Sequence, residues 1–367
     1  MRRNLFVLFL LLTLPACTAG PPAPEDYRYL RGVNAAGGEF NDAPDALPGA
    51  SNQHYAYNQA ELYEYLYDRG HRVVRIPFRW ERLQHSFGED LDPTGLAELE
   101  ATVDAAADAG LFVLLDMHNY GKFVREVDDE EVKLGDGVTT SDFADAWTRI
   151  VHAFKDQPAV IGWGLMNEPI HLPDGPVPTW KVFSQAAVDA IRDAGNTRDI
   201  YVSGNAWGGA QEWPSKNGDP WITDPADSIV YEAHYYLAAN NAGAYPDALA
   251  DVDADAVDRG WDGLRHRVTD EITDFTDWCG EHDVECFIGE MGWPYDEADA
   301  EEWNRLGDVI YDILDAAEIG ATYWAAGTRW NPDYRLQAYS YDDSKTQFSP
   351  NPQTVVIESH PSQLLAD

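Results

Sequence analysis

Eight short apolar runs alternate with longer helical stretches along almost the whole chain. Runs of this length, bounded by turn residues, are typical of strands that are buried on both faces, as parallel strands are. The runs are residues 31–34, 73–77, 112–116, 160–167, 200–203, 229–234, 287–290 and 321–324, and the helical stretches are 59–69, 95–109, 141–155, 179–194, 261–279 and 300–319. No linker divides the 367 residues. The pattern predicts one α/β domain, a single (β/α)8 TIM barrel.

Several of the predicted helices end close to a glycine that stands just before the next apolar run. These glycines are Gly70, Gly110, Gly195 and Gly320. A helix often ends at a residue with positive φ, which glycine adopts without steric cost. The sequence therefore predicts that all four glycines cap helices just before a strand begins.

Two of the apolar runs end on a glutamate or directly before one, and burial alone would not favour a glutamate there. The glutamates are Glu168, in the segment LMNEP, and Glu290, in the segment FIGEMG. They lie 122 positions apart (290 − 168), so they meet only if both strands belong to one sheet closed around a cleft. Paired carboxyl groups that face each other across a cleft are what hydrolysis of a glycosidic bond requires.

Other polar or aromatic side chains also fall at the carboxyl ends of predicted strands. They are Arg75, His118, Asn167, His234 and Trp324. In an α/β barrel the active site lies at this end of the strands. Because packing alone would not gather them there, we predict that they share one site with the two glutamates.

The composition is strongly acidic, with 64 Asp and Glu against 25 Lys and Arg and a formal net charge of −39. We therefore expect no nucleic acid partner, because binding phosphates requires positive charge. The acidic residues are spread along the chain, which predicts a halophilic protein adapted to high salt; an ordinary acidic secreted protein is the alternative. The 13 Trp residues exceed the needs of a core of this size, so we expect some of them to stack on sugar rings.

The first residues resemble an export signal. A basic start precedes an apolar stretch that is too short to span a membrane as a mature helix. The segment LPAC resembles a lipoprotein cleavage box, so we predict a signal peptide over residues 1–17 and lipidation of Cys17; simple cleavage near Ala19 is the alternative. A proline-rich tether over 18–28 would then lead to a catalytic barrel over 29–367. This domain would be extracellular, either secreted or anchored by lipid to the outer face of the cell membrane.

Two further cysteines, Cys279 and Cys286, flank the tight link between a predicted helix and the next strand. In an exported protein they can form a disulfide, with two free buried thiols as the alternative. Residues 128–131 are all acidic, but a charge run of this kind is usually solvated. The sequence contains no phosphate loop and no paired-histidine zinc motif, so we expect neither a metal nor another cofactor.

Six short motifs at the predicted strand ends belong together. They are VVRIP at 73–77, DMHNYG at 116–121, LMNEP at 165–169, HYY at 234–236, IGE at 288–290 and YWAAG at 323–327. With these motifs the chain resembles glycoside hydrolase family five, the large cellulase family. The segments RGVN at 31–34 and SGNAW at 203–207 are also similar to the endoglucanases of that family. The resemblance extends from about residue 31 to residue 330 and implies a retaining glycoside hydrolase.

The resemblance makes Glu168 the acid/base and Glu290 the nucleophile. Arg75 and the hydroxyl of Tyr236 would hold Glu290 as a carboxylate through charge-assisted hydrogen bonds, and Tyr235 is the alternative to Tyr236. Glu168, to which no cation is assigned, would keep its proton until the leaving oxygen takes it.

The remaining site residues would contact the substrate or orient the carboxyl groups. Asn167 would bond to the 2-hydroxyl of the sugar, and Trp324 would form the floor under the cleaved sugar. His118 and His234 would orient the substrate and the two carboxyl groups. Further predicted substrate contacts are Asn34, Glu39, Trp207 and Trp330, and Trp80 and Trp293 are additional candidate platforms for sugars.

The sequence thus predicts a secreted, retaining endo-β-1,4-glucanase that hydrolyses cellulose or related β-glucans without a cofactor. We expect a monomer whose partner is the polysaccharide, with a membrane contact only through an N-terminal lipid. A β-mannanase or another β-glucanase on the same scaffold is the closest alternative. A surface lipoprotein that binds polysaccharide without cleaving it is a further alternative, which the presence of both Glu168 and Glu290 disfavours.

Overall fold

The structure is a computed structural model, and it describes residues 22–365 except 174, 246–248, 250–255, 257 and 296–298. The predicted signal peptide over 1–17, including Cys17, lies outside the described residues, as does the start of the predicted tether over 18–21. In the part of the chain that the structure describes, no helix is both long enough and apolar enough to cross a membrane.

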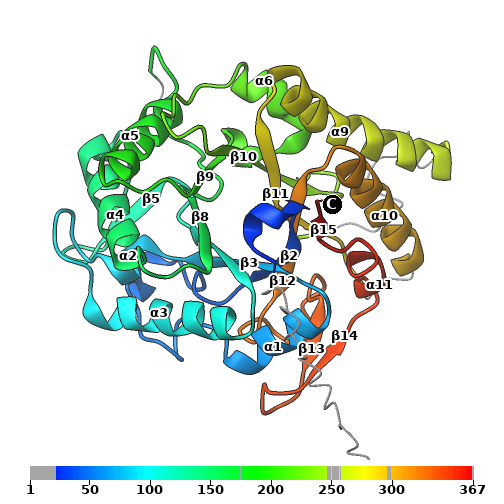
Figure 1. Cartoon of the computed structure of the whole chain (residues 1–367), viewed down its shortest axis with the longest axis horizontal. Coiled ribbons are helices and arrows are strands. Elements are labelled where there is room, and N and C mark those ends of the chain that lie inside the picture. The colour runs from blue at the N-terminus through cyan, green and yellow to red at the C-terminus, as the bar shows by residue number, and fades with distance from the viewer. Residues whose placement is uncertain are drawn as a thin grey trace, which may run out of the picture.

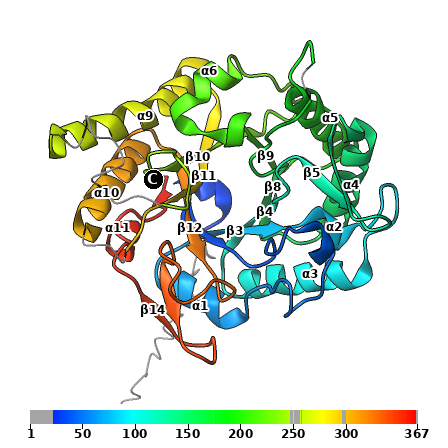
Figure 2. The ribbon, with the colours of Figure 1, turned by 180° about the vertical axis from the view of Figure 1, so that it is seen from behind.

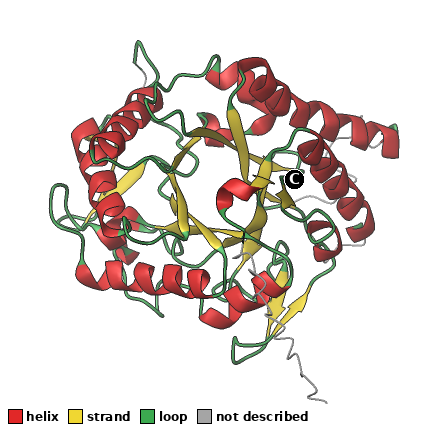
Figure 3. Ribbon diagram, viewed as in Figure 1, coloured by secondary structure: helices red, strands yellow, loops and turns green. Residues whose placement is uncertain are grey.

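Eight parallel strands form a closed barrel, and the long helices surround it as a ring (Figures 1 and 3). The barrel strands are β2 (Arg31–Ala35), β3 (Val73–Phe78), β4 (Phe112–Met117), β8 (Val160–Gly164), β9 (Asp199–Ser203), β10 (Ile229–Tyr236), β11 (Glu285–Gly292) and β12 (Gly320–Ala326). Around the barrel they follow one another in chain order, and β12 pairs with β2 to close it. The predicted (β/α)8 TIM barrel is confirmed, although β8 ends three residues earlier than expected.

The helices pack their apolar sides against the outside of the barrel. They are α1 (Ala60–Asp68), α2 (Trp80–Leu83), α3 (Pro93–Asp108), α4 (Thr140–Ala153), α5 (Thr179–Asp193), α6 (Trp213–Asn217), α9 (Trp261–His282), α10 (Ala300–Ala316) and α11 (Thr354–Ile357). Helix α4 begins at a capping box formed by Thr139 and Asp142. On the barrel side, α4 buries Phe143, Trp147 and Ile150, which recur every three or four residues as a helix packed on one face requires.

The predicted glycine caps are confirmed in three of four cases. Gly70, Gly110 and Gly195 have positive φ values of 97°, 89° and 81°. Gly320 is different, because it begins β12 and the left-handed position before it belongs to Glu318, with φ 58°. A Cβ atom at Gly320 would lie 2.8 Å from the ring of Phe287, so this glycine serves close packing between strands.

An apolar layer fills the barrel beneath the polar strand ends. Leu114, Tyr201, Val230 and Phe287 form a separate buried cluster. Leu114 and Val230 stand two residues before Asp116 and Glu232, so each pair shares one face of its strand. The polar residues at the carboxyl ends of the strands therefore lie above an apolar layer inside the barrel.

Three small sheets extend the barrel. Strands β5 (Lys122–Arg125), β6 (Glu130–Leu134) and β7 (Gly137–Val138) follow β4, and β13 (Tyr339–Tyr341) pairs with β14 (Phe348–Pro350) after β12. Near the two ends of the described chain, β1 (Tyr27–Tyr29) pairs with β15 (Gln363–Leu364). Figure 2 shows the same ring of strands and helices from behind. Because β1 begins inside the predicted tether over 18–28, the folded domain begins earlier than the predicted residue 29.

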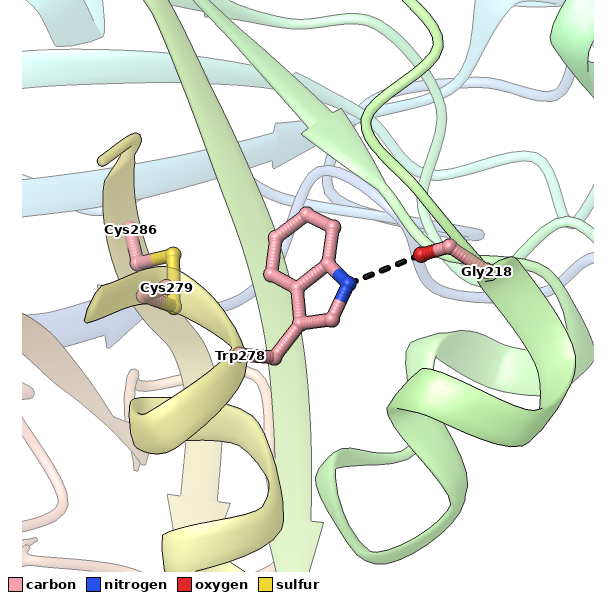
Figure 4. The surroundings of a disulfide bond; sticks show 4 residues. All are labelled: Gly218, Trp278, Cys279 and Cys286. Carbon is pink, nitrogen blue, oxygen red and sulfur yellow. Dashed lines mark hydrogen bonds between the residues drawn. A yellow bond between two sulfur atoms is a disulfide. The ribbon is translucent and has the colours of Figure 1, made fainter. Parts of the chain in front are cut away.

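Cys279 and Cys286 form a disulfide that joins the last turn of α9 to β11 (Figure 4). The alternative of two free thiols is therefore wrong for this structure. Beside the disulfide, Trp278 donates a hydrogen bond from Nε1 to the carbonyl of Gly218 at 2.8 Å. Gly218 directly follows α6, so these contacts fix α9 both to the barrel and to a neighbouring helix.

Candidate active site

The two glutamates meet at the carboxyl end of the barrel. Glu290 lies on β11, and Glu168 lies in the loop after β8 with a positive φ of 44°. A carboxyl oxygen of each lies within 4.8 Å of the other. The side chain of Glu290 is 5 % exposed and that of Glu168 is 18 % exposed. The pair is therefore largely shielded from water and open on the side of Glu168.

Arg75, on β3, is fully buried next to Glu290. Its Nη1 atom lies 3.1 Å from Oε1 of Glu290, and its Nη2 atom lies 3.0 Å from Asp116 and 2.9 Å from Glu232. Burial alone would lower the pKa of Arg75, but the three carboxyl groups raise it well above its usual value. The guanidinium is therefore permanently charged and holds Glu290 in position.

The hydroxyl of Tyr236, on β10, donates a hydrogen bond to Oε2 of Glu290 at 2.7 Å. Tyr235, the alternative that the sequence left open, instead donates to Glu271 on α9 at 2.6 Å. Successive side chains of a strand point to opposite faces, so only one of the two tyrosines faces the site. Arg75 and Tyr236 thus contact both oxygens of Glu290 and fix the orientation of its carboxyl group.

His234, also on β10, contacts three carboxyl groups. Its Nδ1 atom lies 2.8 Å from Glu168 and 3.6 Å from Glu290, and its Nε2 atom lies 3.4 Å from Glu232. Burial would lower the pKa of His234, but these acids raise it to about 10, so the ring is an imidazolium at neutral pH. The expectation that no cation faces Glu168 is therefore wrong. The pKa of Glu168 is nevertheless raised, because burial outweighs the effect of His234.

His118, just past β4, is neutral, because burial lowers its pKa to about 3. Its Nδ1 atom lies 2.7 Å from Asp116, and its Nε2 atom lies 3.2 Å from Nδ2 of Asn167. A neutral imidazole that donates from Nδ1 accepts at Nε2, so Asn167 donates to the ring. The Oδ1 atom of Asn167 accepts a hydrogen bond from Arg75 at 2.8 Å. The amide is therefore held at both ends, and one N–H remains for a ligand.

Two buried acids of the site, Asp116 and Glu232, are not among the residues that the sequence predicted. Asp116 is 1 % exposed and Glu232 is 2 % exposed. Each stands two positions before a site histidine, His118 or His234, and therefore on the same face of its strand. An acid at that spacing inside an apolar strand is the signal that would have found both.

Asn34 was predicted to contact substrate, and this prediction is wrong. Its side chain is fully buried. The Nδ2 atom donates to the carbonyl of Gly289 at 2.8 Å, and the Oδ1 atom accepts from Arg75 at 2.9 Å. Asn34 therefore positions Arg75 and has no surface to offer a sugar.

Residues 33–329 match the sequence model of the family described as cellulase, glycosyl hydrolase family 5. The chain belongs to glycosyl hydrolase family 5. Its enzyme class is therefore glycoside hydrolase.

Named relatives and a solved structure are similar to this family 5 hydrolase over most of its length. Endo-beta-1,4-glucanase B of Aspergillus niger is 30 % identical over 305 residues, which cover 83 % of this chain and 82 % of that protein. Manganese dependent endoglucanase Eg5A of Phanerodontia chrysosporium is 31 % identical over 241 residues, but the match covers 64 % of this chain and 59 % of that protein. The crystal structure of Pseudomonas stutzeri endoglucanase Cel5A in complex with cellobiose has a TM-score of 0.77 at 31 % identity, covering 92 % of this chain and 96 % of that chain.

The predicted aromatic platforms of the hydrolase differ in how much of their ring surface is accessible to a sugar. Trp324, on β12, lies nearly parallel to His118, with ring centroids 5.4 Å apart. Trp207, after β9, is 48 % exposed. Trp330 stacks on Tyr334 with ring centroids 3.8 Å apart, so one of its faces is unavailable to a sugar.

Trp80 and Trp293 were also candidate platforms, and this interpretation is wrong. Both side chains are fully buried. Trp80 begins α2 and packs edge-on against Phe123, with centroids 4.9 Å apart. The ring of Trp293 lies so close to α10 that a Cβ atom at Gly307 would be 2.4 Å from it. Both tryptophans fill the wall around the barrel.

Glu39 lies in the loop after β2 with 8 % of its surface exposed. Its Oε2 atom accepts a hydrogen bond from the backbone of Gly37 at 2.7 Å, whereas its Oε1 atom is buried without a hydrogen-bond partner among the described residues. Burial raises the pKa of Glu39 to about 7. Tyr57 and Trp330 flank the same loop, and each also buries one polar atom without a described partner.

Among the described residues, Glu168, His234 and Glu290 are close enough to share a metal ion, with donor atoms within 4.8 Å of one another. The pKa of His234 lies near 10, because Glu290, Glu168 and Glu232 outweigh its burial, so Nδ1 carries a proton at neutral pH. Arg75 adds a second positive charge beside Glu290. Both positive charges therefore already pair with the two carboxyl groups that a divalent cation would have to bind.

Proposed function

We propose that this hydrolase is an endo-β-1,4-glucanase that cleaves cellulose or related β-glucans with retention of configuration. The observation that carries the proposal is the approach of Glu168 and Glu290, whose carboxyl oxygens lie within 4.8 Å. Retaining glycosidases hold these groups about 5 Å apart, whereas inverting enzymes need about 6.5–9.5 Å to admit a water. The relatives described above are named endoglucanases, which supports the same activity here.

In the first step, Glu290 attacks the anomeric carbon while the bond to the leaving oxygen breaks. Arg75 and Tyr236 hold the two oxygens of Glu290 in position for this attack. Glu168, whose pKa is raised by burial, donates its proton to the leaving oxygen. The free N–H of Asn167 bonds to the 2-hydroxyl of the sugar, a contact that strengthens as the ring approaches an oxocarbenium ion.

In the second step, the roles of the carboxyl groups reverse. Glu168, now a carboxylate beside the imidazolium of His234, takes a proton from water. The oxygen of this water attacks the anomeric carbon as its proton leaves, and the ester bond to Glu290 breaks. Two displacements at one carbon restore the original configuration and return both glutamates to their starting charge.

The order of the strands around the barrel indicates which side of the cleft holds the leaving group. The acid/base stands on the side of the leaving group, and Glu168 follows β8 while Trp207 follows the neighbouring β9. A cavity of about 580 Å³ lies between the loops after these two strands, with room for part of a leaving chain. Glu39 and Trp330 follow β2 and β12 across the barrel, so they face the sugars that stay attached to the enzyme.

Enzymatic assays on four polysaccharides test the proposed substrate. We expect reducing ends to appear fastest from soluble cellulose or mixed-linkage glucan and slowest from mannan, with glucomannan between them. The viscosity of soluble cellulose should fall much faster than reducing ends appear, because internal cleavage shortens chains quickly. A highest rate on mannan would identify a β-mannanase, and release of single glucose units at unchanged viscosity would identify an exo-acting enzyme.

We propose in addition that the enzyme works outside the cell, because residues 1–17 resemble an export signal and the polymer cannot enter a cell. Mass spectrometry of the mature N-terminus tests this directly. A lipid-modified Cys17 is the expected result. An unmodified start after Ala19 would instead identify a freely secreted enzyme, and an intact Met1 would contradict export.

A further inference from the structure

Glu232, on β10, is a buried carboxylate that cannot reach a substrate, yet it contacts both cations of the site. Its Oε1 atom lies 2.9 Å from Nη2 of Arg75 and 3.4 Å from Nε2 of His234. A Cβ atom at Gly289 would lie 1.9 Å from the same oxygen, so β11 leaves space for this carboxylate by carrying glycine there. The position of Glu232 thus depends on three separate strands.

During the proposed reaction the negative charge moves from Glu290 to Glu168, the two carboxyl groups that lie near Nδ1 of His234. Before the first step the negative charge is on Glu290, and after it Glu290 is an ester while Glu168 has lost its proton. The Nδ1 atom of His234 lies 2.8 Å from Glu168 and 3.6 Å from Glu290. A cation at this place stabilises the charge on either carboxyl group without a large movement.

We propose that Glu232 is a positioning residue that keeps His234 as an imidazolium. The Nδ1–H of His234 can then donate a hydrogen bond to Glu168 and to Glu290 in turn. The inference rests on the retaining mechanism proposed above. Glu232 does not touch the sugar or the reacting atoms, and it acts only through the charge and orientation of His234.

Other charged or titratable groups surround His234, but none is equivalent to Glu232. They are Glu168 after β8, Glu290 on β11, Arg75 on β3, Asp116 on β4, His118 after β4 and Tyr236 on β10. Glu168 and Glu290 each lose or gain charge within a catalytic cycle. Asp116 bonds to His118, whose ring is neutral. Burial raises the pKa of Glu232, but Arg75 and His234 lower it further than burial raises it, so Glu232 keeps its charge throughout.

The substitution Glu232→Gln tests the proposal, because it removes the charge and keeps the shape. In 15N spectra of the unliganded enzyme, His234 should stay protonated to about pH 10 in the natural protein, whereas in E232Q, which keeps Glu290 and Glu168, it should lose its proton at a clearly lower pH. The kcat/KM on cello-oligosaccharides should fall at least about tenfold, because proton donation from Glu168 loses its supporting cation. The kcat/KM on dinitrophenyl cellobioside should fall less than about threefold, since that leaving group needs no proton.

Asp116→Asn is the matched control, because it also removes a buried carboxyl group that faces Arg75. In D116N we expect the signals of His234, assigned by comparison with H234N, to remain those of an imidazolium at pH 7. If E232Q leaves His234 protonated to pH 9 and lowers kcat/KM equally on both substrates, Glu232 only braces Arg75 and the proposal is wrong. If E232Q does not fold, the spectrum of the natural protein decides, because a His234 ring that is neutral at pH 7 there would equally overturn the proposal.

The proposed function has its own readout. The first anomer that appears from cellotetraose, followed by 1H NMR, is expected to be β in the natural enzyme. An α product would refute the retaining mechanism, whereas the titration of His234 is measured without substrate and judges the role of Glu232 separately.

Discussion

A carboxyl oxygen of Glu168 lies within 4.8 Å of a carboxyl oxygen of Glu290, although their strands are separated in the barrel by β9 and β10. Arg75 and Tyr236 bind Glu290, and His234 approaches Glu168 more closely than it approaches Glu290. The two acids therefore have different surroundings, and variants can separate their roles.

Glu290→Ala and Glu168→Ala should each lower kcat on soluble cellulose by at least about 100-fold, for different reasons. In E290A, azide can occupy the space of the carboxylate and should give a glycosyl azide of inverted configuration. In E168A, dinitrophenyl cellobioside should still form the glycosyl-enzyme, and azide should then give a product of retained configuration. NMR of the azide products identifies the configurations. The opposite assignment would show that the acid/base and the nucleophile are exchanged.

Tyr236→Phe and Tyr235→Phe form a matched pair, because the tyrosines are adjacent and each donates one hydrogen bond to a glutamate. Y236F removes a hydrogen bond to the charged nucleophile, which is worth about 1.5–3 kcal/mol, so kcat should fall by about 10- to 150-fold. Y235F removes a bond to Glu271, outside the site, and kcat should change by less than about twofold. The melting temperatures of both variants provide the control for folding. Equal losses of kcat in the two variants would contradict the assignment of Tyr236.

Much of the fold and half of the site follow from local patterns that the sequence displays. Apolar runs that alternate with helical stretches allow few architectures, so the barrel was predictable. Glu168, Glu290 and Arg75 were predictable because a charged residue at the end of a buried strand has few structural roles. A place near a strand end was not enough for Asn34 and Trp80, whose side chains are fully buried.

What the sequence could not reveal depends on contacts between distant strands. Asn34 is removed from the cleft because Gly289 and Arg75, on two other strands, take up its hydrogen bonds. The charge of His234 is set by acids on three different strands or their loops, so its sequence neighbours do not determine it. Such properties require the closed barrel itself.

Removing metal ions should leave the activity unchanged. His234 and Arg75 place two positive charges around Glu168 and Glu290, which disfavours a divalent cation there. We expect equal kcat on soluble cellulose after dialysis against EDTA and after addition of Mn²⁺. A loss of kcat in EDTA that Mn²⁺ restores would contradict this interpretation of the site.

Glu39 should make the stability of the enzyme depend on pH. Burial raises its pKa from 4.5 to about 7, so the folded protein binds a proton that the unfolded chain has already lost. The free energy of unfolding therefore decreases as pH rises from about 4.5 to 7, by on the order of 2 kcal/mol from this group. Glu39→Gln removes the effect and can still accept the hydrogen bond from Gly37.

The comparison is made by chemical denaturation at several pH values. At pH 8, E39Q should be more stable than the natural protein, and near pH 4.5 the two should be equal. A stability difference that is the same at both pH values would show that Glu39 does not carry this proton.

The acidic surface should make the folded enzyme depend on salt. With 64 acidic against 25 basic residues, the net charge of −39 repels itself in dilute buffer. The Debye length falls from about 10 Å at 0.1 M salt to about 3 Å at 1 M, so molar salt removes most of this repulsion. We expect the melting temperature, measured by calorimetry, to rise steadily between 0.05 and about 2 M NaCl, and to rise equally with KCl because screening depends on ionic strength. A melting temperature that does not change with salt would refute the adaptation to high salt, and the site around Glu168 and Glu290 would be unaffected by that result.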